Sequence, residues 1–240
     1  MDHIQTVFAD RLAKYNISLT EQQFDQFEIY LRELVSWNEK MNLTGITERE
    51  QVYTKHFYDS ISLSFFVNMK EITTVADIGS GAGFPSIPLK ICFPHLKVTI
   101  VDSLNKRIQF LNLLVEQLGL TDVQCIHGRA EDVARQFKYR DQFDLVTARA
   151  VARLAVLNEF CLPFVRVGGA FAAMKGTDLT DEIKEASRSF KELKGSVNRV
   201  EHFKLPVEDS DRHIVIVDKK GPTSAKYPRK AGTPLKSPLL

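Results

Sequence analysis

Three alternating glycines directly follow an apolar segment, and this pattern is suited to binding a nucleotide-like ligand. Residues 75–83 read VADIGSGAG, with Gly79, Gly81 and Gly83 at every second position. Glycine adopts positive φ angles without strain and lets the backbone approach a ligand closely. A purely structural turn between a strand and a helix is the simpler explanation, so a binding site needs further support.

The residues around the glycines distinguish between two cofactors. A Rossmann dinucleotide loop reads G-x-G-x-x-G, and its third glycine would fall at Phe84. Asp77 lies two positions before Gly79, where its carboxylate would repel a pyrophosphate. S-adenosylmethionine carries an ammonium and a sulfonium group and no phosphate. The loop therefore favours S-adenosylmethionine and predicts a methyltransferase, with an NAD-linked oxidoreductase as the alternative.

A second acidic residue strengthens the cofactor interpretation. Residues 97–101 form a strand-like run that ends in Asp102. About 20 residues beyond a glycine loop, an acidic side chain at the tip of the second strand is placed to accept hydrogen bonds from ribose hydroxyls. A single Asp at a strand end is usually just solvated. The loop and the acid at this spacing together predict a cofactor site.

Strands and helices alternate through most of the chain, which predicts a mainly parallel, doubly wound sheet. Residues 205–211 leave no room for a helix between the last two strands, so these should pair antiparallel as a hairpin. We therefore predict an α/β fold with the seven-stranded, Rossmann-like sheet of class I methyltransferases, preceded by an N-terminal helical segment. The expected strands occupy residues 72–78, 97–102, 123–127, 143–148, 168–174, 197–204 and 212–218.

The chain is expected to have three parts. Residues 1–70 form a helical segment packed on the core, 71–219 form the methyltransferase domain, and 220–240 form a basic, proline-rich arm. Capping boxes at Thr20–Gln23 and Thr47–Glu50 predict where two of the helices begin. Because the chain enters the first strand directly from these helices, they should cover the sheet near the cofactor.

Basic residues are concentrated at the C-terminus. The chain carries a formal net charge of +2, yet residues 219–240 contain six Lys and Arg and no acidic residue. A mildly acidic body with a basic tail predicts a polyanionic partner, with Arg229 and Lys230 as RNA contacts. A solvated tail is the alternative. We expect removal of residues 226–240 to weaken RNA binding and to leave cofactor affinity near normal.

Composition disfavours several other classes of protein. No stretch approaches the ~20 apolar residues of a membrane span, and the N-terminus lacks the basic and apolar regions of an export signal. Cys92, Cys125 and Cys161 are widely separated and predict reduced core thiols. No His, Cys and Asp cluster has metal-ligand spacing. We expect a cytoplasmic monomer without a metal.

Residues that follow the later strands should complete the site, because ligands of such sheets bind at the carboxyl ends of the strands. After the third strand, Glu131 is placed to hold the adenine amino group, and Ala130 leaves room for the flat ring. Arg149 and Lys175 follow the fourth and fifth strands. Both should project into the cleft, towards an RNA phosphate or the methionine carboxylate. A solvated strand-end charge is the alternative for both.

The sequence lacks the groups that many base methyltransferases use. Residues 147–150 read TARA, unlike the Asn/Asp-Pro-Pro-aromatic loop of amino-group methylation, and Cys161 lies too far along the next helix to serve as a nucleophile for pyrimidine C5 methylation. A site so poor in acids and bases suits N7 of guanine, which has a free lone pair. We assign no catalytic residue; alignment for in-line displacement, worth ~7–11 kcal/mol, would supply the rate.

Further motifs extend over nearly the whole chain. They are residues 77–89 (DIGSGAGFPSIPL), Trp37-Asn38, Asn42-Leu43-Thr44, His56, Asp59-Ser60, residues 128–131 (GRAE), residues 147–150 (TARA) and residues 227–234 (YPRKAGTP). With these motifs the chain resembles the small-subunit ribosomal RNA guanine-N7 methyltransferase family, also called glucose-inhibited division protein B. The tail and the Gly-Phe-Pro turn are specific to that family.

The resemblance implies methylation of N7 of one guanine in the decoding-region loop of 16S rRNA, with S-adenosylmethionine as donor. It also implies that Gly79, Phe84, Ala130, Glu131 and Arg149 line the cofactor site. A non-catalytic, S-adenosylmethionine-sensing protein that binds RNA or the ribosome is the rival interpretation. Transfer of a labelled methyl group to small-subunit RNA separates the two.

Overall fold

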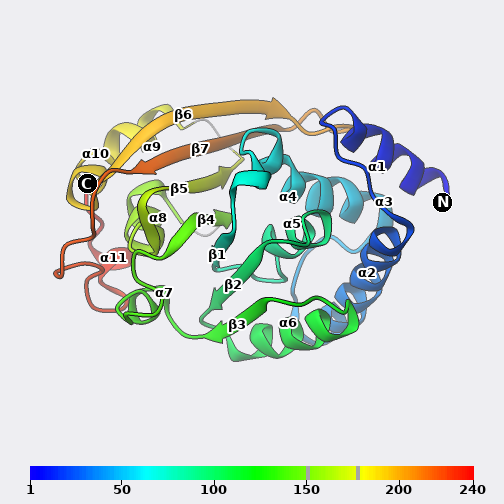
Figure 1. Ribbon diagram of the computed structural model, residues 1–240, viewed down its shortest axis with the longest axis horizontal. Coiled ribbons are helices and arrows are strands. Elements are labelled where there is room, and N and C mark those ends of the chain that lie inside the picture. The colour runs from blue at the N-terminus through cyan, green and yellow to red at the C-terminus, as the bar shows by residue number, and fades with distance from the viewer. Residues whose placement is uncertain (150–151, 177–178) are drawn as a thin grey trace.

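The computed structural model describes residues 1–149, 152–176 and 179–240 (Figure 1). Ala150, the last residue of the TARA motif, lies outside the described residues.

A single seven-stranded sheet runs through the molecule in the order β3-β2-β1-β4-β5-β7-β6 (Figure 1). Neighbours among the first five strands pair in parallel, whereas β7 pairs antiparallel with both β5 and β6. This confirms the predicted α/β fold and its C-terminal hairpin. The strands are β1 (Thr74–Ile78), β2 (Lys97–Asp102), β3 (Val123–His127), β4 (Phe143–Arg149), β5 (Val165–Lys175), β6 (Gly195–Lys204) and β7 (Asp211–Lys219).

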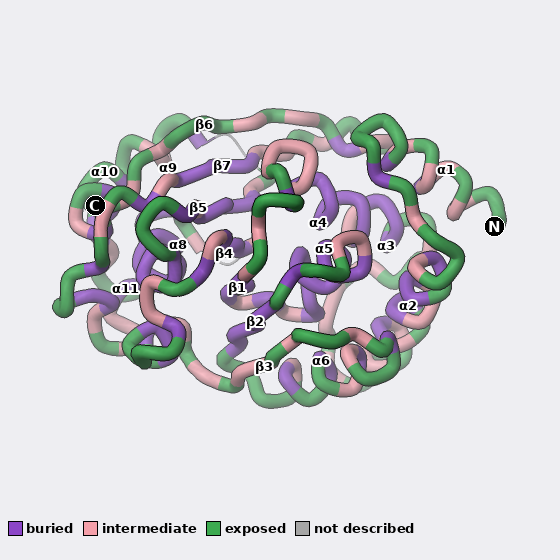
Figure 2. The backbone as a smooth tube through the Cα atoms, in the orientation of Figure 1, coloured by how far each residue is buried: buried purple, intermediate pink, exposed green. Residues whose placement is uncertain are grey.

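Helices cover both faces of the sheet, and each face has its own hydrophobic core. One core joins the sheet to the N-terminal helices, α5 and α6, and the other joins it to α7, α8 and α10. The central strands are buried in Figure 2, whereas β6 at the sheet edge is mostly exposed or half-buried. The helices after β1 are α5 (Ser86–Cys92), α6 (Asn105–Gln117), α7 (Ala130–Val133), α8 (Leu154–Cys161), α9 (Thr180–Glu185), α10 (Ser187–Glu192) and α11 (Thr233–Lys236).

The N-terminal residues are helical, as expected. The predicted capping box is present at α2, because the Thr20 side chain accepts from the Gln23 amide and the Gln23 side chain accepts from the Thr20 amide. The second predicted box is wrong: Glu48, not Thr47, caps the next helix by accepting from two amides. The segments are α1 (His3–Ala13), α2 (Glu21–Met41), α3 (Arg49–Val52), η1 (Tyr53–Tyr58), α4 (Asp59–Ile61), η2 (Ser62–Phe65) and η3 (Met69–Glu71).

The C-terminal residues fold back against the body of the same chain. Tyr227 and Leu239 are buried in the core around α8. The Arg140 guanidinium donates to the carbonyls of Thr223 and Ser224. Residues 220–240 therefore have a packed route across the protein's own surface, and α11 within them lies against α8.

Candidate cofactor site

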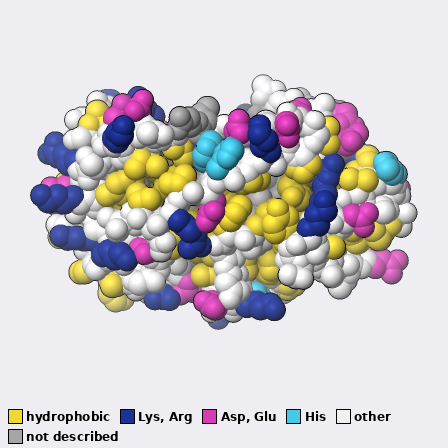
Figure 3. Space-filling model, turned by 90° about the horizontal axis from the view of Figure 1, so that it is seen from above, with side chains coloured by type: hydrophobic (Ala, Val, Ile, Leu, Met, Phe, Trp, Pro, Cys, Tyr) yellow, Lys and Arg dark blue, Asp and Glu magenta, His cyan; other side chains and the backbone are white. Residues whose placement is uncertain are grey.

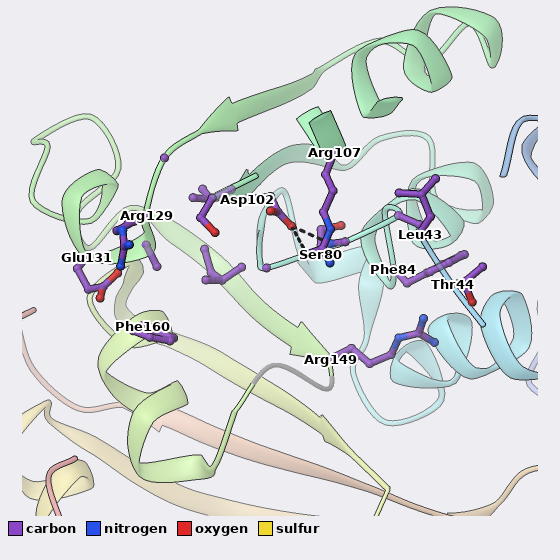
Figure 4. A pocket seen from close by; sticks show the side chains of 18 of the residues that line it. Leu43, Thr44, Ser80, Phe84, Asp102, Arg107, Arg129, Glu131, Arg149 and Phe160 are labelled. Atoms are coloured by element: carbon purple, nitrogen blue, oxygen red, sulfur yellow. Dashed lines mark hydrogen bonds and ion pairs between the residues drawn. The ribbon is translucent and has the colours of Figure 1, made fainter. Parts of the chain in front are cut away.

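A cavity of about 500 Å³ opens at the carboxyl ends of β1, β2 and β4 and beside α7 (Figure 4). Phe84, Thr44 and Arg149 lie at one end of it, and Glu131, Arg129 and Phe160 lie at the other. The position agrees with the rule that ligands of open parallel sheets bind beyond the strand ends, where the strand order reverses. Here that reversal lies between β1 and β4.

The glycine turn lies along one side of the cavity. Gly79 and Gly81 have φ angles of 75° and 63°, which other residues rarely adopt. The Gly79 amide donates to the Val101 carbonyl at 2.8 Å, and the Gly81 amide donates to Asp102 Oδ2 at 3.1 Å. These bonds join the turn to the end of β2. No atom lies within 4 Å of the place where a Cβ on Gly81 would stand, so the turn leaves open space for a ligand.

Gly83 does not line the cavity, and its lack of a side chain instead allows neighbouring elements to pack closely. A Cβ at this position would stand 2.8 Å from both Ile87 Cγ1 and the Tyr30 hydroxyl, and 3.1 Å from Leu111 Cδ2. Its φ angle is 101°. The third glycine therefore allows α2 and α5 to approach the turn. The Tyr30 hydroxyl fixes this approach by donating to the Ala82 carbonyl at 2.6 Å.

Asp77 also lies outside the cavity wall. It is fully buried on β1, and its Oδ2 accepts from the Ser86 amide at the start of α5 at 3.2 Å. Burial raises the pKa of Asp77 to about 7. Asp77 thus supports the turn and the helix that follows it, and any effect on a bound cation acts through the turn.

Asp102 does line the cavity, at the tip of β2. Its carboxylate accepts from the amides of Leu104 and Gly81 and from Arg107 Nη1, at 2.9, 3.1 and 3.4 Å. The residue is only 2 % exposed. A carboxylate held in this way presents acceptors in a fixed direction, which is what a pair of ribose hydroxyls requires.

Three side chains from separate elements pack together at the Arg149 end. The His56 ring stacks on Phe84 with 4.6 Å between centroids, and Arg149 Cζ lies 4.7 Å from the Phe84 centroid. His56 Nε2 lies 2.7 Å from Thr44 Oγ1. Arg149 binds Asp59 Oδ2 at 2.9 Å. Burial, with the nearby Arg149 charge, lowers the pKa of His56 to about 3, so its ring is neutral at physiological pH.

At the other end, the C-terminal residues close the cavity. Glu131 is buried on α7, and its Oε1 accepts from the Gly232 amide at 2.8 Å. Leu235 from α11 lines the cavity beside Phe160 of α8. Sequence patterns predicted neither contact, because both join residues that lie far apart in the chain.

Seven of the nine predicted cofactor residues line this cavity: Gly79, Gly81, Phe84, Asp102, Ala130, Glu131 and Arg149. Asp77 and Gly83 do not. Sequence patterns did not indicate the other lining residues: Leu43, Thr44, His56, Ile78, Ser80, Ala82, Val101, Ser103, Arg107, Gly128, Arg129, Phe160 and Leu235. Several of these lie within motifs that carried the family resemblance, and those motifs were the one signal that could have found them: Leu43, Thr44, His56, Ser80, Gly128 and Arg129 are examples.

The three predicted RNA contacts have different surroundings. The Lys175 ammonium donates to the Ala152 carbonyl at 2.9 Å and pairs with Glu182 at 2.8 Å. Arg229 is held by Glu159, a fully buried carboxylate, at 2.7 Å. Lys230 is exposed. Contact with RNA stays a prediction for all three, and Lys230 is the one whose side chain faces solvent freely enough to reach a phosphate without breaking an ion pair.

The cavity fits S-adenosylmethionine. Gly81 leaves open space at the turn, and two buried carboxylates, Asp102 and Glu131, supply acceptors for hydroxyl and amino groups. Ala130 and Phe160 leave a mainly apolar surface beside Glu131 for the flat adenine ring. We therefore expect Asp102 to hold the ribose and the Glu131 end to hold the adenine. This orientation directs the reactive end towards Phe84 and Arg149.

Other chemistry has little support in the described parts of the chain. Within those ranges, no group of three or more His, Cys, Asp or Glu side chains is placed to hold a metal ion. Burial raises the pKa values of the Cys92 and Cys161 thiols, which disfavours the reactive thiolate. Among the described helices, none is long and apolar enough to cross a membrane.

Two solved structures with a similar fold carry the name methyltransferase. The chain superposes on an O-methyltransferase from Bacillus cereus in complex with SAH with a TM-score of 0.55 and 18% identity, covering 79% of this chain and 90% of that one. It superposes on the SAM-dependent O-methyltransferase TM0748 from Thermotoga maritima with a TM-score of 0.52 and 18% identity, covering 80% and 72%. At these identities the likeness concerns the fold alone.

Relatives with much higher identity specify the family. The chain is 57% identical over 233 residues to "Ribosomal RNA small subunit methyltransferase G" of Brevibacillus brevis, covering 97% of this chain and 98% of the relative. It is 54% identical over 235 residues to the protein of that name in Exiguobacterium sibiricum, covering 98% and 99%. The family model described as "rRNA small subunit methyltransferase G" matches residues 23–215. The chain therefore belongs to the rRNA small subunit methyltransferase G family.

Proposed function

We propose that this protein methylates N7 of one guanine in the decoding-region loop of 16S rRNA, with S-adenosylmethionine as the methyl donor. The family names a small-subunit rRNA methyltransferase, and the relatives match over nearly the full chain. The single observation that carries the proposal is the cavity at the strand ends, where Asp102 and the glycine turn fit the cofactor. A cytoplasmic monomer that acts on the small subunit is part of this proposal.

When bound, S-adenosylmethionine supplies the methyl group: the N7 lone pair forms the new C–N bond, the electrons of the breaking C–S bond stay on sulfur, and the positive charge passes to the purine. No proton moves, so the chain needs no general base. The neutral ring of His56 is compatible with this reaction, because it adds no positive charge beside the sulfonium of the donor. The main contribution of the protein is to hold donor and acceptor in line, worth ~7–11 kcal/mol.

An exposed basic cluster offers a surface for RNA phosphates. In Figure 3, Lys and Arg side chains gather at the end of the molecule where α10 and the start of the C-terminal residues lie. The cluster is formed by Arg188, Lys191, Lys194, Lys220 and Lys226. A bond from the Lys220 amide to the Lys194 carbonyl joins two of its members, and Lys220 and Lys226 also pair with Asp218 and Glu192. Such a cluster, together with Lys230, would give binding that weakens with salt.

The decisive experiment follows a labelled methyl group from S-adenosylmethionine to small subunits taken from cells that lack this protein. We expect one equivalent of label in 16S rRNA, at N7 of a guanine, and no N7-methylguanine at that position in the cells before treatment. Binding of the cofactor without any transfer of label would instead support the non-catalytic sensor.

A further inference from the structure

A second cavity, of about 350 Å³, adjoins the cofactor cavity. His56 and Arg149 line both of them. The remaining walls come from Ile46 in the loop before α3, from η1 and α4, and from the ends of β5, β6 and β7. In-line transfer requires the acceptor atom to lie about 3–3.5 Å from the methyl carbon. An acceptor site must therefore lie directly next to the donor site, and His56 and Arg149, which border both cavities, place this one there.

His56 and Arg149, where the two cavities meet, are held in place by contacts on both sides. On the side of the cofactor cavity, Phe84 stacks against His56 and lies beneath Arg149. On the other side, the Asp59 carboxylate binds Arg149 at 2.9 Å and Arg212 at 3.0 Å. Asp59 is 5 % exposed. The two guanidinium groups are thus held at set positions by one carboxylate between them.

The lining suits a flat, uncharged heteroaromatic ring. The apolar side chains of Ile46, Met174, Phe203 and Ile214 supply surfaces for its faces. Arg212 lies at the edge of the lining, where Asp59 Oδ1 accepts from its Nε and Ser210 Oγ and the Asp211 carbonyl accept from its Nη1, so Nη2 is the nitrogen placed to donate to a ligand. A guanidinium has five N–H donors and no acceptor, so it selects a keto oxygen over an amino group.

We propose that this second cavity holds the target guanine base, with N7 directed to the place beside His56 and Arg149 where the two cavities meet, and O6 facing Arg212. This inference rests on the proposed function and specifies where its acceptor binds. Guanine presents O6 beside N7, whereas adenine presents an amino group there. Arg212 therefore distinguishes the two purines while N7 stays free for the methyl group.

Filling the cavity tests its role. Ile46 is half-buried, lines the second cavity and does not line the first. We expect Ile46→Trp to lower kcat/KM for small subunits by about 10²-fold, because it displaces the base from the methyl group, with an unchanged Kd for S-adenosylmethionine. Ile4→Trp is the matched control, since Ile4 is also half-buried but lines a small separate cavity beside α1. Phe203→Ala, which widens the second cavity, should lower kcat/KM in the same selective way.

The inference is overturned if Ile46→Trp and Phe203→Ala retain normal kcat/KM, or if each loses cofactor affinity in proportion. It is also overturned if Ile4→Trp loses as much activity as they do. These results differ from failure of the proposed function, in which the wild-type protein itself transfers no methyl group to N7.

Base analogues test the contact to Arg212. Small subunits are reconstituted with inosine, which keeps O6 and N7, or with 2,6-diaminopurine, which has an amino group in place of O6, at the target position. We expect inosine to be methylated nearly as fast as guanine and 2,6-diaminopurine about tenfold more slowly. Arg212→Gln should shrink the difference between the analogues. Equal rates for both analogues with the wild-type protein would exclude recognition of O6.

Discussion

The two aspartates that the sequence singled out have different positions. Asp102 lies on the cavity wall and is joined to the glycine turn, whereas Asp77 lies beneath the turn and caps α5. Both lie near the carboxyl ends of neighbouring strands, and no sequence pattern indicates which carboxylate faces the ligand. In the structure, Asp77 accepts from the Ser86 amide at the start of α5, whereas Asp102 faces the cavity.

Substitution at Gly81 tests the turn. Gly81→Asp would adopt a left-handed conformation, at a cost of about 1–2 kcal/mol, and would place a second carboxylate beside Asp102, which already accepts from the Gly81 amide. With repulsion included, we expect the Kd for S-adenosylmethionine to rise about 100-fold. Gly81→Ala adds no charge but puts a Cβ into the space that the turn leaves for the ligand, and it should raise the Kd about tenfold. Calorimetric titration measures both, and normal binding by Gly81→Asp would refute this site.

The raised pKa of Asp77 predicts that cofactor binding depends on pH. A bound cation favours the ionised carboxylate, so binding should release a proton from Asp77, and affinity should increase as the pH rises from about 6 to 8. The sign for stability is opposite, because the folded pKa of about 7 exceeds the ordinary 3.8. The stabilisation by protonated Asp77 is therefore lost as the pH rises through about 7. Asp77→Asn should remove the part that Asp77 contributes to the pH dependence of cofactor affinity and of stability. Unaltered pH profiles for both quantities in this variant would show that Asp77 causes neither.

At the level of secondary structure, the sequence predicted the strands well because most of them contain a short apolar run between turn residues. The predicted strands at 97–102 and 123–127 coincide with β2 and β3, and the two hairpin strands are within two residues at each end. The N-terminal helices were less predictable. Glu48 replaces Thr47 as a cap, and residues Tyr53–Tyr58 form a π-helical stretch for which no periodicity rule accounts.

The site was partly predictable for a related reason. The glycines and Asp102 follow directly from strand ends, so their positions relative to the ligand follow from the fold. His56 and Leu235 reach the cavity through long-range packing of helices that local patterns do not describe. The same holds for the second cavity, whose walls combine residues from η1, β5 and β7.

The contact between α2 and the turn yields a prediction at this scale. Tyr30→Phe removes the donor to the Ala82 carbonyl and leaves that carbonyl buried without it, which should destabilise the protein by about 1–3 kcal/mol. It should also weaken cofactor binding, because Ala82 belongs to the turn. Tyr53→Phe is the control, since it loses a bond to Glu28 away from the cavity. Equal cofactor affinities in the two variants, measured alongside urea unfolding, would show that Tyr30 only stabilises the fold.

The whole molecule differs most from expectation at its C-terminus. We predicted that removing residues 226–240 would leave cofactor affinity near normal, but the structure makes these residues part of the cavity. Leu235 lines it, and the Gly232 amide holds Glu131. The basic composition of the segment concealed this role, because charge patterns report on possible partners and not on packing within the chain.

Truncation and a point variant separate the two roles of the segment. Deleting residues 226–240 should now weaken S-adenosylmethionine binding as well as RNA binding, and Leu235→Ala should weaken the former alone. Arg229→Met leaves Glu159 buried and unpaired, which should cost about 3–5 kcal/mol of stability. Adding Glu159→Leu should restore much of it. Failure of the second substitution to rescue the first would show that Arg229 contributes through other contacts.

The walls of the cofactor cavity come from residues as far apart in the chain as Leu43 and Leu235. No partly folded form contains all of them, so the ligand can bind only when the strands, the N-terminal helices and the closing C-terminal helix are assembled together. S-adenosylmethionine is therefore a global stabiliser: at a concentration of 100 times its Kd it would add about 2.7 kcal/mol to the free energy of unfolding. Starvation for the methyl donor would then reduce how much of the enzyme survives proteolysis, as well as how fast it works.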